Sequence, residues 1–115
     1  MTDSMAADET PYALVVRFTV RPGSEAEFDE LITRVAAGVR ELEPETLVFA
    51  CHHVEGASLQ RVFYELYRDK AAFDAHSQQP HVRDFTAARA PLLESTVVDY
   101  MTLTDGKAPV ADPTS

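Results

Sequence analysis

One glutamate lies within an apolar, strand-like run near the middle of the chain. In the sequence FYELY, Glu65 shares a strand face with Phe63 and Tyr67, because side chains alternate between the two faces. A carboxylate on an apolar face must be paired, hydrated or protonated. An apolar pocket would raise its pKa, so that Glu65 could accept a proton near neutral pH. The alternative is a structural ion pair with Arg17 or Arg68 on a more hydrated face.

Two histidines follow on predicted helices. His76 comes after Ala72 and Phe73 at helical spacing, so it lies on the inward face of a short helix. There it could act as a base near pH 7, or be a core histidine that is hydrogen-bonded to the backbone. His81 follows Pro80 at a helix start, where the helix dipole disfavours a protonated imidazole. His81 could therefore be a neutral acceptor or a surface cap.

Aromatic residues accompany these groups. Phe63, Tyr67, Phe73 and Phe85 are each typical of a hydrophobic core, but together they could line a pocket for a flat, apolar ligand. Cys51, in the middle of a predicted strand, fits a small core residue better than a nucleophile.

The spacing of the histidines argues against a metal site. His52 and His53 are neighbours on a predicted strand, so their side chains point to opposite faces. His76 and His81 are separated by a proline and do not have the spacing by which one helix presents two ligands. The sequence contains neither a glycine-rich phosphate loop nor a Gly-x-Ser-x-Gly motif. We therefore expect no metal and no cofactor.

The composition predicts a single domain. The 115 residues, 45% of them hydrophobic, suffice for one compact domain but not for two ordinary ones. Ten scattered basic residues against nineteen acidic ones give a net charge of -9, which argues against nucleic acids and anionic membranes as partners. No segment resembles a signal peptide or a membrane span, and the single Cys51 has no disulfide partner. We therefore expect a cytoplasmic protein.

The order of the predicted elements indicates the fold. Polar residues 1–10 and proline-containing residues 105–115 are expected to be disordered tails around a folded domain at 11–104. Ser24 and Glu27 have the capping-box spacing of a helix start. Periodicity and turn residues predict strands at 12–20, 46–54, 59–68 and 95–103, and helices at 24–42, 70–77 and 80–90. This βαββαβ order is typical of an α+β, ferredoxin-like domain with an antiparallel sheet.

Both faces of the predicted sheet carry apolar side chains. The first strand presents Val16 on one face and Val15 on the other, and the third strand presents Phe63 opposite Val62 and Tyr64. Helices can cover only one of these faces. Leaving the other face in water would forgo about 5 kcal/mol, comparable to the stability of a small domain. We therefore predict a homodimer, which a folded monomer at micromolar concentration in a sedimentation experiment would contradict.

Three segments, VVRFTVRPGSEAEFDELI, FYELYRDKAAFDAH and PHVRDF, together resemble the antibiotic biosynthesis monooxygenase family, particularly its small quinol-monooxygenase-like members. The resemblance extends over residues 12–103. It implies a dimeric α/β barrel in which a pocket between sheet and helices holds an electron-rich aromatic, such as a quinol or polyphenol. It also implies oxidation of this substrate by O₂ without flavin, haem or metal.

The resemblance suggests roles for the residues singled out above. Glu65 or His76 would remove a phenolic proton, while Tyr67 and His81 would orient substrate oxygens. The residues expected to contact the substrate are Phe63, Phe73, Phe85, Val16 and Phe18. Two other functions stay open: a dimeric small-molecule binding protein without activity, and an isomerase of a small hydroxy-carbonyl metabolite.

Overall fold

The computed structural model describes residues 10–109, so residues 1–9 and 110–115 of the expected tails lie outside the described part. Residues 105–109 follow the last strand without forming a helix or a strand. The elements in chain order are β1 (Tyr12–Val20), α2 (Glu25–Leu42), β2 (Thr46–Val54), β3 (Ala57–Tyr67), α3 (Lys70–Gln78), α4 (Pro80–Arg89), the 3₁₀ turn η1 (Ala90–Leu92) and β4 (Leu93–Thr102).

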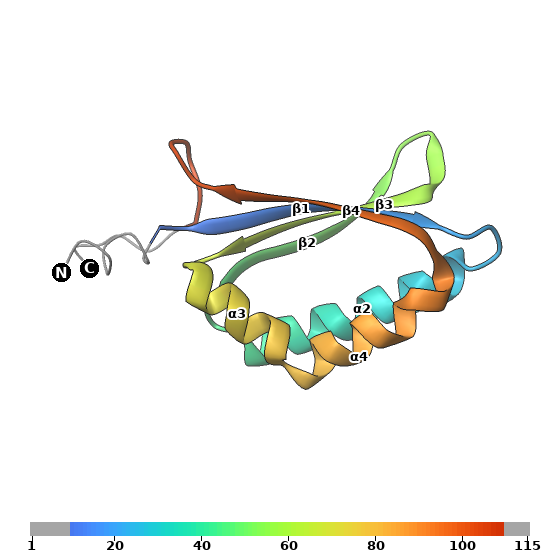
Figure 1. Ribbon diagram of the computed structural model, residues 1–115, viewed down its shortest axis with the longest axis horizontal. Helices are drawn as coiled ribbons and strands as arrows, with labels where there is room; N and C mark the ends of the chain where they lie inside the picture. Colours follow the sequence, from blue (N-terminus) through green and yellow to red (C-terminus); the bar gives the residue numbers. More distant parts are fainter. Residues whose placement is uncertain (1–9, 110–115) are drawn as a thin grey trace.

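The four strands form one antiparallel sheet in the order β2-β3-β1-β4. Figure 1 shows α2, α3 and α4 on one side of this sheet, while the β2–β3 hairpin bends away from them. The arrangement is the ferredoxin-like α+β fold that the order of the elements predicts. Strand β3 begins earlier than predicted, because Gly56 takes a φ of 77° and lets the chain reverse within two residues.

The predicted capping box at the start of α2 is wrong. Ser24 precedes the helix, but its φ of -102° and ψ of 5° differ from the extended backbone that lets a side chain turn back onto the first helical N–H groups. The Ser24 side chain makes no capping hydrogen bond. Instead, a carboxylate oxygen of Glu25 accepts a hydrogen bond of 2.7 Å from the backbone N–H of Gly23. The helix therefore starts where predicted, but a different carboxylate supports it.

The two later helices begin and end for the expected local reasons. The carboxylate of Asp69 accepts from the backbone N–H of Ala72 at 2.8 Å and caps α3. Pro80 occupies the first turn of α4, where its missing N–H is not needed, and Pro91 lies in the 3₁₀ turn that follows. Within residues 10–109, no helix has both the length and the apolar character needed to cross a membrane.

The hydrophobic core lies between the sheet and the helices. Phe18 on β1 contacts Phe28 on α2, Phe63 on β3 and Phe85 on α4, with ring centroids 5.2, 4.8 and 6.5 Å apart. All four side chains are buried. Each such side chain stabilises the fold by about 1.5–3 kcal/mol relative to exposure. These four rings therefore pack α2 and α4 against strands β1 and β3.

The opposite face of the sheet is not covered by helices (Figure 1). Val15 pairs with Tyr64 in the β1–β3 ladder, and both side chains remain partly exposed. Val97 on β4 is 57% exposed. These residues match the apolar outer face that underlies the prediction of a homodimer, which stays a prediction.

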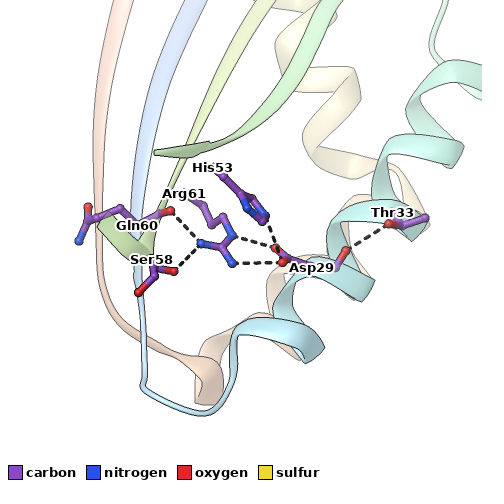
Figure 2. A network of polar contacts seen from close by, with 6 residues as sticks. All are labelled: Asp29, Thr33, His53, Ser58, Gln60 and Arg61. Atoms are coloured by element: carbon purple, nitrogen blue, oxygen red, sulfur yellow. Dashed lines mark hydrogen bonds and ion pairs between the residues drawn. The ribbon is translucent and has the colours of Figure 1, made fainter. Parts of the chain in front are cut away.

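A buried arginine joins β3 to α2 (Figure 2). The Arg61 side chain is 3% exposed; its Nε and Nη2 donate to the two carboxylate oxygens of Asp29 at 2.8 and 3.1 Å. Its Nη1 donates to the carbonyls of Ser58 and Gln60 at 2.8 and 2.9 Å. His53 also contacts the Asp29 carboxylate, at 3.1 Å. The hydrogen bond from Arg61 lowers the pKa of Asp29 against the opposing effect of burial.

Candidate functional site

Three of the predicted site residues converge in the interior. Glu65 and Tyr67 lie on the helix-facing side of β3, and the Tyr67 hydroxyl donates a hydrogen bond of 2.6 Å to Oε1 of Glu65. Nε2 of His76, on α3, lies 4.0 Å from the same oxygen. The exposed fractions are 6% for Glu65, 0% for Tyr67 and 7% for His76. A carboxylate, a phenol and an imidazole therefore meet in a nearly dry environment.

The alternative of an ion pair between Glu65 and Arg17 or Arg68 is wrong. Arg17 donates instead to the side chain of Gln60 at 3.2 Å, and Arg68 donates to Glu45 at 2.9 Å. Both arginines are exposed, whereas Glu65 points into the core. The direct partner of this carboxylate is the neutral hydroxyl of Tyr67.

A fourth residue, Glu43, completes the site and was missed by the sequence analysis. Glu43 follows α2 directly and is 8% exposed. Its Oε1 accepts from the hydroxyl of Thr46 at 2.7 Å and faces Nδ1 of His76 at 2.7 Å. Its Oε2 faces Nε2 of His81 at 2.5 Å. One signal was available, because a glutamate at the C-terminal end of a helix is opposed by the helix dipole and needs other partners.

The contact with Glu43 determines which ring nitrogen of His76 carries the proton. An ionised carboxylate can only accept hydrogen bonds, so Nδ1 of His76 must carry the proton that it donates to Glu43. The neutral imidazole then has its free electron pair on Nε2, the nitrogen nearest to Glu65. We refer to Glu43, Glu65, Tyr67 and His76 together as the two-carboxylate cluster.

The two carboxylates of this cluster have pKa values shifted in opposite directions. Burial would raise the pKa of Glu43, but hydrogen bonds from Thr46, His76 and His81 outweigh it and lower the pKa. Burial raises the pKa of Glu65, and the hydrogen bond from Tyr67 offsets this only in part. Burial and the nearby Glu65 also raise the pKa of Tyr67, so its phenol stays protonated. Such a division is typical of sites in which one carboxylate stays ionised and another exchanges a proton.

His81 reaches the cluster from α4 because α2 carries a glycine at the crossing point. A β-carbon on Gly38 would lie less than 3.0 Å from the ring of His81. Without it, the imidazole packs against the helix backbone and its Nε2 contacts Glu43. His81 is therefore neither a surface cap nor free at Nε2; the sequence predicted its position but not its partner.

The predicted substrate-contacting residues divide into two groups. Phe73 packs beside the cluster, with its ring 5.3 Å from that of Tyr67 and 6.3 Å from that of His76. The other four lie deeper in the hydrophobic core, and they are Phe63, Phe85, Val16 and Phe18. Phe73 is partly exposed, so it is the member of the set that a ligand reaches with the least rearrangement.

Among the cavities lined by residues 10–109, three lie between the elements that carry these side chains. A cavity of about 130 Å³ between the end of α2 and α3 is lined by Glu43 and His76, so it reaches the cluster from outside. A second, of about 180 Å³, lies between α2 and α4 and is lined in part by His81. A third, of about 330 Å³, lies between the end of α4 and the start of β4 and is lined in part by Arg89.

The remaining candidate residues have other surroundings. Within residues 10–109, no group of three or more His, Cys, Asp or Glu side chains is arranged to hold a metal ion. Cys51 is partly buried, and burial together with the nearby Glu65 raises the pKa of its thiol to about 12. A thiol that stays protonated at neutral pH is a poor nucleophile.

Comparison with known proteins identifies the family to which this chain belongs. The model of the antibiotic biosynthesis monooxygenase family matches residues 11–88, and the chain belongs to this family. None of the curated proteins with which the chain was compared matches it.

Solved structures show the same fold. A Caulobacter crescentus protein whose name refers to antibiotic biosynthesis monooxygenases is 22% identical, with a TM-score of 0.80 over 91% of this chain and 100% of its own. A Mycobacterium tuberculosis protein is 23% identical, with a TM-score of 0.80 over 86% of this chain and 100% of its own. A Pseudomonas aeruginosa protein is 23% identical, with a TM-score of 0.77 over 85% and 98%. At these identities the likeness concerns the fold alone.

Proposed function

We propose that the protein is a monooxygenase that oxidises a small aromatic substrate of the quinol or polyphenol type with O₂, without a cofactor. The observation that carries this proposal is the buried Glu65 carboxylate, hydrogen-bonded to Tyr67 and 4.0 Å from His76. Membership of the monooxygenase family supports the reaction class.

The reaction needs little from the protein beyond a base, orientation and exclusion of water. A base removes the phenolic proton, and the phenolate transfers one electron to O₂. The resulting substrate radical and superoxide combine to form a carbon–oxygen bond. Loss of water from this peroxide leaves a new carbonyl oxygen on the ring, so one oxygen atom enters the product and the other leaves as water.

Two residues are suited to the role of the base. Burial raises the pKa of Glu65, which makes its carboxylate a stronger proton acceptor than an exposed one. His76 offers Nε2 as an acceptor, and Glu43 would stabilise the imidazolium that forms. Tyr67 and His81 would orient substrate oxygens, and Phe73 would contact the ring. We also expect a second copy of the chain to cover the open face of the sheet.

The test is oxygen consumption with a panel of quinols, measured for the parent and for the variants Glu65→Gln and His76→Gln. Because general base catalysis contributes about 10²–10⁴-fold, at least one variant should lose about 100-fold in rate. Glu30→Gln, an exposed change on α2, is the matched control and should keep the parental rate.

The outcomes separate the proposed reaction from the two alternatives. If both variants oxidise an accepted quinol at the parental rate, the assignment of the base is wrong. A binding protein would show a raised melting temperature with ligand but no oxygen consumption. An isomerase would give a product of unchanged mass, whereas the product of the proposed oxidation gains one oxygen atom and loses two hydrogen atoms.

A further inference from the structure

Arg89, the last residue of α4, is a half-buried cation without a direct anionic partner. Its guanidinium lies over the rings of Phe18 and Phe85, with its central carbon 5.0 and 5.1 Å from the two ring centroids. Among residues 10–109, no side chain or carbonyl forms a hydrogen bond or an ion pair with it. Glu65 acts on it electrostatically without contact.

This arrangement is unusual for a charge that is partly removed from water. Buried cations are normally paired, because removal from water is compensated only by direct partners. Arg61 in the same protein has four such hydrogen bonds. In Arg89 the two aromatic contacts use the faces of the guanidinium, so its five N–H donors stay uncommitted. Burial accordingly lowers the pKa of Arg89.

Arg89 also lines a cavity of suitable size and chemistry. The cavity of about 330 Å³ is lined by Arg89 and by three residues with hydroxyl groups, Thr86, Ser95 and Thr96. Pockets for small molecules start at about this volume. Glu94 also lines the cavity, and it is exposed. A guanidinium with neighbouring hydroxyls is a typical setting for a planar carboxylate, which the guanidinium fork binds through two parallel hydrogen bonds.

We propose that this cavity binds the carboxylate of an aromatic substrate, with Arg89 as the group that recognises it. Because this inference concerns the substrate, it rests on the proposed function. It limits the proposed substrates to quinols that carry an acidic substituent. The net charge of -9 makes the acidic protein repel anions in general, so a preference for an anion requires a local cation. Arg89 supplies that cation.

Binding would also affect the base. Arg89 favours the ionised form of Glu65 through space. A substrate carboxylate bound to Arg89 would neutralise this influence, so Glu65 would become more basic when the substrate is present. The cavity and the two-carboxylate cluster would then act on the same molecule.

The experiment compares an acid with its neutral ester under anaerobic conditions, where no turnover interferes. The probes are 2,5-dihydroxybenzoate and its methyl ester, and binding to the full-length protein is measured by calorimetry. We expect the parent to bind the acid at least tenfold more tightly than the ester. Arg89→Gln should remove this preference, while Arg89→Lys should keep part of it. Arg83→Gln, an exposed change on the same helix, is the control and should leave it unchanged.

Each result has a defined meaning. Equal binding of acid and ester by the parent, or no binding of either at millimolar concentration, would overturn the proposal without the use of any variant. A preference that survives in Arg89→Gln would overturn the role of Arg89. If the acid binds in an Arg89-dependent way but no oxygen is consumed with it in air, the binding site stands and the proposed oxidation fails.

Discussion

Two buried charged networks lie between the helices and strand β3, and they are built in opposite ways. In the network around Arg61, every direct partner of the guanidinium is a carboxylate or a backbone carbonyl (Figure 2). In the two-carboxylate cluster, Glu43 is well supplied with donors, whereas Glu65 has one neutral donor and lies near a second carboxylate. The first network fixes a charge, and the second leaves one carboxylate able to change its protonation state.

The contrast between the two networks separates structural from chemical roles among charged side chains in the interior. A buried ion pair with complete partners is consistent with holding β3 against α2, because its charges gain nothing from a ligand. A buried group with incomplete partners retains a raised free energy that a proton or a ligand can lower. Glu65 and Arg89 belong to this second kind, and they act on each other electrostatically.

The largest loss of stability is expected when the network around Arg61 is broken. Asp29→Ala would leave the Arg61 guanidinium buried without its carboxylate, and we expect a loss of about 2–3 kcal/mol in the free energy of unfolding. This is below the value for a fully buried pair, because Asp29 is 35% exposed and water compensates in part. Urea denaturation measures the change.

The double variant Asp29→Ala with Arg61→Met removes both charges and should recover much of the lost stability. Glu30→Ala, an exposed change next to Asp29, should alter stability by less than about 0.5 kcal/mol. A loss below about 1 kcal/mol for Asp29→Ala would mean that the network contributes little.

An intermediate loss of stability is expected when Glu43, the carboxylate with several hydrogen-bond donors, is replaced. Glu43→Gln replaces a charged acceptor of three hydrogen bonds, so stability at pH 7 should fall by about 2 kcal/mol. The folded pKa of Glu43 lies below its ordinary value of 4.5, so its contribution is present above pH 4.5 and is lost as the pH falls through the folded pKa. The difference between parent and variant, measured by urea denaturation from pH 7 to 3, should therefore shrink below about pH 4.5. A difference that stays constant over this range would contradict the assignment of an ionised Glu43.

The smallest change in stability is expected at Glu65, where the substitution should stabilise the protein. The folded pKa of Glu65 lies above 4.5, so the parent is favoured below pH 4.5 and loses stability as the pH rises through the raised pKa. Glu65→Gln removes this loss while its side-chain oxygen can still accept from Tyr67. We expect the variant to be more stable than the parent by about 1 kcal/mol at pH 8, with the advantage fading towards pH 4. Thermal denaturation at several pH values measures this, and a variant less stable than the parent at pH 8 would show that the Glu65 charge is well compensated.

The sequence predicts the fold well but the site only in part. Strands and helices depend on local periodicity and turn residues, so β1, α2 and β2 lie at the predicted positions. Strand alternation places Glu65 and Tyr67 on one face and helix spacing turns His76 inward, but their convergence is seen only in the structure. Glu43 contacts His76 and His81 across 33 and 38 positions of the chain, and the local pattern carries no information at that distance.

The same reason explains why the roles of the arginines could not be predicted. Arg61 meets Asp29 across 32 positions, and Arg89 is defined by the absence of a direct partner among the described residues. Both depend on how α2 and α4 cross the sheet. Strand alternation gives Arg61 the same face of β3 as Phe63, but only the packing of α2 against the sheet brings the Asp29 carboxylate to it.

The close approach of Gly38 to His81 has a consequence for how this protein can change. Any side chain at position 38 would occupy the space of the imidazole, so the two positions are not independent. Alanine at 38 becomes acceptable only if a smaller residue stands at 81, and that exchange would remove one hydrogen-bond partner of Glu43. A library that varies position 38 alone would therefore sample mostly defective proteins, whereas paired variation of 38 and 81 could redesign the cavity between α2 and α4.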